Sequence, residues 1–126
     1  MKVEKGYESL AEVLVEALEQ AQHLKGFACH ANNLPFLEQE IIKEGRTLGL
    51  MGHVFQIRKK VREAANCPDP ARAIEDILGA MVYSAAMILL IREKAEKTAA
   101  APITEFYQDR KNGLVTGTIP TGRPLI

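Results

Sequence analysis

The chain has 126 residues, of which 47% are apolar, enough for one domain with a hydrophobic core. Its 16 basic and 16 acidic side chains cancel, so the overall charge indicates neither a nucleic-acid-binding protein nor an acidic tail. The opening residues, MKVEKGYESL, contain no apolar stretch typical of a secretion signal, and we expect a cytoplasmic protein. Cys29 and Cys67 form no C-x-x-C pair, which favours free thiols and leaves one disulfide as the alternative.

The first predicted element is an amphipathic helix from about residue 7 to residue 25, which Gly26 is expected to end. Its apolar residues recur every three or four positions, and glutamates occupy its other faces. Because these polar faces are acidic, we interpret the apolar stripe as a core-packing face and not as a membrane face. The stripe consists of Leu10, Val13, Leu14, Ala17, Leu18, Ala21 and Leu24.

Two further helices are predicted before the NCPDP segment. A loop over residues 26–35 leads into a short helix that starts near Asn33 and Pro35 and ends at Gly45. Thr47 is then expected to cap a third helix. The residues expected to point inward from this helix are Leu50, Met51, Val54, Ile57, Val61 and Ala65.

A fourth helix is predicted over residues 70–99, with Asp69 as its N-cap and Pro70 at its first position. Its segment ILGAMVYSAAMILLI carries no charge, but a membrane span needs about 20 apolar residues, so we expect no membrane insertion. The segment is apolar nearly all round, and one small domain offers too few neighbours to cover it. This pattern predicts a homo-oligomer.

The last segment, residues 101–126, is rich in Gly, Pro and Thr and has no helical period. It is interpreted either as a disordered tail or as an extended arm that lies across a neighbouring subunit. The predicted fold is therefore all-α: an antiparallel helical hairpin or bundle of about four helices over residues 1–100, followed by an irregular extended tail.

Two acids at the turn between the third and fourth helices are candidate metal ligands. A tight connection through Pro68 and Pro70 makes these helices antiparallel neighbours and places Glu63 and Asp76 at similar height. Two carboxylates can hold one Mg²⁺, which takes oxygen ligands and keeps several waters. The alternative is that both acids are solvated helix charges.

The segment GRTLGLMGHVFQIRKKVREAANCPDPARAIEDIL, residues 45–78, resembles the MazG-like all-α nucleoside triphosphate pyrophosphohydrolases, in particular a phage-type dATP/dGTP diphosphohydrolase-like branch. The resemblance implies a helical oligomer. It also implies Mg²⁺ bound by E-x-x-E on one helix and E-x-x-D on the next, and cleavage of the α–β phosphate bond. Glu63 matches the second acid of the first pair and Asp76 the last acid of the second. Lys60 and Ala73 stand where the pattern has its other two acids.

This departure makes the implied site more positive, because two carboxylates are missing and one ammonium is added. A Mg²⁺ site is weakened by that change, whereas binding of an anion without metal is favoured. A basic run lies at the same place, in which Arg58 and Arg62 share one helix face. Its residues, Arg58, Lys59, Lys60 and Arg62, are candidate phosphate ligands, and a solvated basic surface is the alternative.

Other side chains give further candidates for a site. If a helix starts at Thr47, its free N–H groups, Arg46 and Lys43 can bind a phosphate; an ordinary capped helix start is the alternative. Zinc-ligand types also occur, but their spacing matches no common zinc site. These residues are His23, Cys29, His30 and Cys67. The aromatic residues that can form either a base-stacking wall or core are Phe27, Phe36, Phe55 and Tyr83.

The sequence thus predicts non-catalytic binding of a nucleotide, a cyclic nucleotide or a nucleotide-derived signal, with no cofactor. The resemblance suggests a phage-type sequestering protein that acts in the host cytoplasm. One alternative is a Mg²⁺-dependent pyrophosphohydrolase that uses Glu63 and Asp76 with further acids such as Glu40 or Glu44. The other is a helical protein-interaction module. Neither a nucleic acid nor a membrane is expected as a partner.

Overall fold

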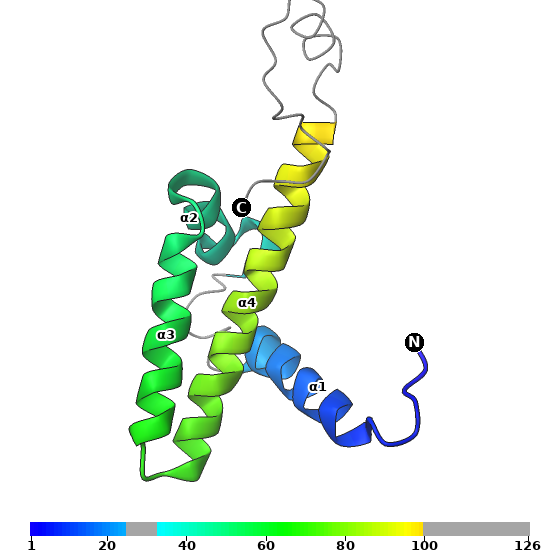
Figure 1. The fold of residues 1–126 in the computed structure, drawn as a ribbon, viewed down its shortest axis with the longest axis vertical. Helices are drawn as coiled ribbons and strands as arrows, with labels where there is room; N and C mark the ends of the chain where they lie inside the picture. The colour runs from blue at the N-terminus through cyan, green and yellow to red at the C-terminus, as the bar shows by residue number, and fades with distance from the viewer. Residues whose placement is uncertain (25–32, 100–126) are drawn as a thin grey trace, which may run out of the picture. The chain divides into compact units, whose positions relative to one another are not determined.

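A computed structural model describes residues 1–24 and 33–99 (Figure 1). The described residues form four α-helices and a short 3-10 helix and include no strand. The predicted all-α class is therefore confirmed. The elements are α1 (Glu8–His23), η2 (Phe36–Glu38), α2 (Glu40–Leu48), α3 (Met51–Asn66) and α4 (Pro70–Ala99).

The chain divides into two compact units, Met1–Ile88 and Leu89–Ile126, and the boundary lies within α4. The first unit contains α1, η2, α2, α3 and more than half of α4. In the second unit the described residues are those that continue α4 to Ala99. The tail predicted over residues 101–126 lies outside the described residues, so its two interpretations stay predictions.

The helices α3 and α4 form an antiparallel hairpin (Figure 1). The His53 ring meets the Tyr83 ring edge-on, with centroids 5.7 Å apart, and further along α3 Lys60 lies against Gly79 and Tyr83. The start of α4 is capped as predicted, because Asp69 Oδ1 accepts a hydrogen bond of 3.1 Å from the N–H of Ala71. The predicted hairpin is confirmed.

The boundary between α2 and α3 differs from the prediction. Gly45 is buried inside α2, which continues to Leu48 and ends at Gly49 with φ +81°. A glycine adopts this left-handed conformation without the steric penalty of a side chain, so Gly49 and not Gly45 ends the helix. Thr47 lies in the last turn of α2, where its Oγ1 donates to the Lys43 carbonyl at 3.1 Å. The prediction of Thr47 as the N-cap of α3 is wrong.

The core of the first unit contains few large side chains. Ala17 is the one residue of the predicted α1 stripe that is buried, while Leu10, Leu14 and Leu18 are 54%, 54% and 55% exposed. The prediction that this stripe packs into the core of the single chain is thus wrong for most of its residues. The buried apolar residues of this unit are Ala17, Ile42, Ala64, Leu78, Ala80 and Ala86.

Helix α4 is long and apolar enough to cross a membrane by length and composition, with a mean hydropathy of 1.8 over its most apolar window. Only 28% of that window is buried. The uncharged segment alone is too short to cross a membrane, but together with flanking residues, charged ones included, the helix is long and apolar enough. The apolar core helix of an assembled protein has the same composition, so the expectation of no membrane partner stays a prediction.

Candidate functional site

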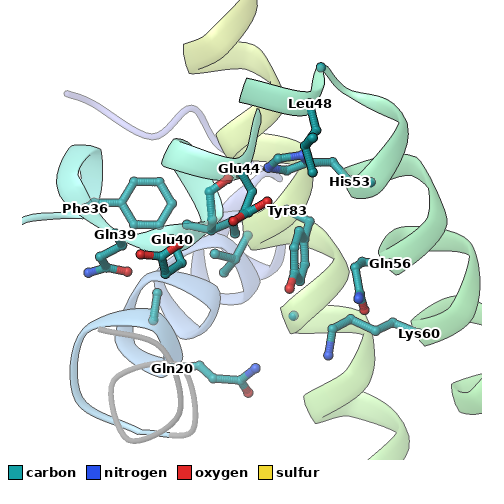
Figure 2. A pocket seen from close by; sticks show the side chains of 16 residues that line it. Gln20, Phe36, Gln39, Glu40, Glu44, Leu48, His53, Gln56, Lys60 and Tyr83 are labelled. Carbon is teal, nitrogen blue, oxygen red and sulfur yellow. Dashed lines mark hydrogen bonds between the residues drawn. The ribbon is translucent and has the colours of Figure 1, made fainter. Parts of the chain in front are cut away.

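A pocket of about 320 Å³ lies within the first unit and is lined by residues of all four α-helices and of η2 (Figure 2). Pockets of this size accommodate small organic ligands, and a few polar groups on an apolar wall orient them. The polar and aromatic lining residues are Gln20, Phe36, Gln39, Glu40, Glu44, His53, Gln56, Lys60 and Tyr83.

The α3 wall of the pocket carries His53, Gln56 and Lys60, which are spaced by three and four residues and share one helix face. His53 is buried, and its Nε2 lies 2.6 Å from the Ile41 carbonyl oxygen. A carbonyl oxygen only accepts, so Nε2 carries the proton and donates. This hydrogen bond and the ring contact with Tyr83 link α2, α3 and α4 around the pocket.

Lys60 is the cation of the pocket. Its Nζ lies 6.0 Å from the Tyr83 ring centroid, in reach of a cation–π attraction. A Cβ atom added at Gly79 would lie 3.2 Å from this Nζ, so the glycine leaves the room that the lysine side chain occupies. In the described part of the chain no ion pair neutralises Lys60. An anionic ligand can therefore act as its counter-ion.

Tyr83 contributes both an aromatic face and a hydroxyl to the pocket. Its side chain is half-buried, and this burial raises the pKa of the phenol above its usual value of 10.0, because desolvation disfavours the phenolate. The hydroxyl therefore remains protonated and able to donate a hydrogen bond at neutral pH.

Acceptor groups gather around α2 and α1. Glu40 and Glu44 lie one turn apart on α2, with exposed side chains. The Gln20 amide nitrogen donates to the Glu75 carbonyl at 3.0 Å, and that of Gln39 donates to the Leu34 carbonyl at 2.9 Å. Each amide keeps its oxygen as an acceptor and one further N–H as a donor.

The basic run predicted to bind phosphate is divided between pocket and surface. Lys60 alone of the four residues lines the pocket. Lys59 forms an exposed ion pair of 3.9 Å with Glu63, and Arg58 and Arg62 are exposed. The four residues therefore do not form one site in the first unit.

Arg46 and Thr47 do not lie at a helix N-terminus, as an anion site there requires. Both belong to the last turn of α2, where carbonyl groups and the negative end of the helix dipole are found. Helix α3 begins only at Met51. The predicted geometry of a phosphate site on N–H groups after Thr47 is therefore wrong.

The two candidate metal ligands have different environments. Glu63 is exposed and paired with Lys59, whereas Asp76 is buried, and neither lines the pocket. Among residues 1–24 and 33–99, no three or more His, Cys, Asp or Glu side chains are grouped to hold a metal ion. A role of Glu63 and Asp76 in metal binding stays a prediction.

The remaining candidates divide in a similar way. Phe36 and Tyr83 line the pocket, Phe55 is exposed elsewhere, and Phe27 lies outside the described residues. Of the possible zinc ligands, His23 pairs with Glu19 at 3.0 Å and Cys67 is a free thiol. Cys29 and His30 lie outside the described residues.

His53, Gln20, Gln39 and Gln56 were not predicted from the sequence as pocket residues. A signal for two of them was present, since His53, Gln56 and Lys60 recur at helical spacing on one face of α3. No protein-family model, curated protein or solved structure matches the chain. The function of the pocket is therefore inferred from the chemistry of the residues that line it.

Proposed function

We propose that the protein binds a nucleotide or a nucleotide-derived signal in the pocket around Lys60, without catalysing a reaction on it. The observation that carries this proposal is the Lys60 ammonium, placed over Tyr83 in a concave pocket with no ion-pair partner among the described residues. An ammonium with three N–H donors is a suitable ligand for a phosphate group. Phe36 and Tyr83 supply aromatic surface for a base.

The non-catalytic character is supported by a departure from the acid positions of the MazG-like pattern. Lys60 stands at one of those positions and points its positive charge into the pocket, where it repels a divalent cation. Ala73 stands at another, but it lines a separate groove and not this pocket. A phage-type protein that sequesters a nucleotide signal is the form of this function that the resemblance suggests.

A binding measurement with and without metal tests the proposal. We expect nucleotides to raise the melting temperature equally in EDTA and in Mg²⁺, because stabilisation depends on ligand concentration relative to Kd and needs no metal here. Lys60→Ala should reduce that shift, and Arg62→Ala, a cation on the exposed surface, serves as the matched control. Absence of binding across a broad nucleotide panel would refute the proposal.

The alternative of a pyrophosphohydrolase is supported by two carboxylates in the pocket, Glu40 and Glu44. Oxygen ligands of this kind can bind Mg²⁺ together with substrate phosphates. This alternative requires Mg²⁺-dependent release of pyrophosphate from a nucleoside triphosphate that Glu44→Gln abolishes. If pyrophosphate is released with that dependence, the non-catalytic proposal is wrong.

The alternative of an interaction module, together with self-association, is favoured by a second, apolar groove between α1, α3 and α4. Among its lining residues, Val61 is 45% and Ile74 53% exposed in the single chain. Glu16 borders the groove on α1, and Arg58, three residues before Val61, shares the helix face of Val61 on α3.

We propose that a second copy of the chain covers this groove. A two-fold rotation places the acidic α1 side of each copy against the basic α3 side of the other, so the surface is complementary to itself.

A further inference from the structure

The charges that line the pocket limit the charge of the ligand. Two carboxylates, Glu40 and Glu44, accompany one ammonium, Lys60. A nucleoside triphosphate carries several negative charges close together, and these would need more than one cation for neutralisation. The pocket therefore favours a ligand with little negative charge.

A second cation is not provided from the same helix. Arg58, Lys59 and Arg62 are exposed and do not line the pocket. The Lys60 side chain lies in the space beside Gly79, with its Nζ 6.0 Å from the centroid of the Tyr83 ring. One ammonium in one place can form charge-assisted hydrogen bonds with one phosphate group.

The Glu40 carboxylate lies across the pocket from this cation, and that of Glu44 lies nearer Tyr83 (Figure 2). Figure 2 shows Phe36, Gln39 and Glu40 on one side of the pocket and Gln56 and Lys60 on the other, with Tyr83 between them. Carboxylate and amide oxygens accept hydrogen bonds, so this side fits a ligand end that carries N–H or O–H donors. The exocyclic amine of a base and the hydroxyls of a ribose are groups of that kind.

We infer that the ligand is a nucleotide with a single phosphate group, either a monoester or a cyclic diester, and not a di- or triphosphate. Its phosphate lies at Lys60, and its donor-bearing end lies at Glu40 and Glu44. This inference rests on the proposed function and specifies the class of nucleotide that the same pocket accepts.

Calorimetric titration in EDTA tests the phosphate number. The probes are AMP, ADP and ATP, the corresponding guanine nucleotides, and cyclic AMP and cyclic GMP. We expect the tightest binding from a monoester or a cyclic diester and a weaker affinity with each added phosphate. A triphosphate that binds more tightly than every single-phosphate nucleotide would overturn the inference and leave the proposed function intact.

Variants locate the two ends of the ligand. Lys60→Gln should weaken binding of the preferred nucleotide about tenfold or more, in the range of a lost charge-assisted hydrogen bond, while binding of the parent nucleoside stays unchanged. Glu40→Gln and Glu44→Gln should each reduce the difference in affinity between single-phosphate nucleotides and triphosphates. The control is Glu38→Gln, an exposed acid on η2 that does not line the pocket. If Glu40→Gln and Glu44→Gln leave that difference in affinity unchanged, the pocket carboxylates do not limit the charge of the ligand. If no nucleotide binds the wild type, the proposed function itself is wrong.

Discussion

The Nζ of Lys60 and the ring centroid of Tyr83 lie 6.0 Å apart, across the two helices of the α3–α4 hairpin. The contact holds a positive charge at the pocket wall on an aromatic face. It depends on Gly79, one turn before Tyr83 on α4, because the lysine side chain occupies the space beside this glycine. Gly79 and Tyr83, both on the largely apolar helix α4, thus determine where the Lys60 ammonium lies.

Gly79→Ala should weaken nucleotide binding without lowering the stability of the fold. The new Cβ would lie 3.2–3.3 Å from the Lys60 Nζ, Cδ and Cε atoms, so the flexible lysine moves and nucleotide affinity falls. Stability should be unchanged or rise by up to about 1 kcal/mol, because alanine is the better helix former. Calorimetry and urea unfolding measure the two quantities.

The control for the stability measurement is Gly52→Ala on α3, where an added Cβ meets no protein atom within 4 Å. Gly52 also lines the pocket, so this variant is compared by urea unfolding and not by nucleotide affinity. It reports the effect of helix propensity without displacing Lys60. Equal nucleotide affinities for Gly79→Ala and the wild type would contradict the role given to Gly79.

His53→Phe should destabilise the first unit. The ring contact with Tyr83 can persist, but the half-buried Ile41 carbonyl loses the His53 donor that lies at 2.6 Å. Loss of one side-chain hydrogen bond costs about 0.5–1.5 kcal/mol, which urea unfolding at neutral pH would detect. His23→Phe, at an exposed histidine on α1, is the control. A stability equal to that of the wild type would show that this hydrogen bond contributes nothing.

The elements with strong local signals could be predicted from the sequence. Asp69 and Pro70 indicate the start of α4 through capping chemistry, and the apolar run fixes its helical character. The end of α2 could not be predicted in this way, because both Gly45 and Gly49 are possible helix stops. Packing decides between them: Gly45 is buried within the helix, and Gly49 adopts the positive φ.

The site was only partly predictable for a related reason. Periodicity identifies the face of a helix but not the neighbour that the face meets, and Lys60 appears in the sequence as one member of a basic run. Its separation from Arg58 and Arg62 follows from the position of Tyr83 on α4, a contact between residues that are distant in sequence. The acceptors Gln20 and Gln39 depend likewise on how α1 and α2 pack.

Tyr83 should make stability sensitive to alkaline pH. Burial raises the pKa of Tyr83 in the folded state above the 10.0 of the unfolded state. Its contribution is therefore fully present below pH 10.0 and is lost as the pH rises through the folded-state pKa. Tyr83→Phe should show a smaller alkaline loss of unfolding free energy than the wild type, whereas Tyr7→Phe, at an exposed tyrosine, should match the wild type. Identical profiles for Tyr83→Phe and the wild type would contradict this assignment.

Self-association through the groove between α1, α3 and α4 should depend on its exposed apolar residues. Ile74 is 53% exposed in the single chain, so Ile74→Glu can leave the fold intact while it places a carboxylate in the apolar surface between two copies. We expect the wild type to sediment above the 13.9 kDa of one chain and Ile74→Glu to sediment as a folded monomer. Val15→Glu, at an exposed valine of α1 that does not line the groove, should assemble as the wild type does. A charge exchange tests the proposed pairing of Glu16 with Arg58. Glu16→Arg or Arg58→Glu alone brings like charges together across the two-fold interface and weakens assembly, and the double variant restores opposite charges and assembly. A wild-type protein that stays a folded monomer at high concentration would refute self-association, and a double variant no better than the single ones would refute this arrangement of the two copies.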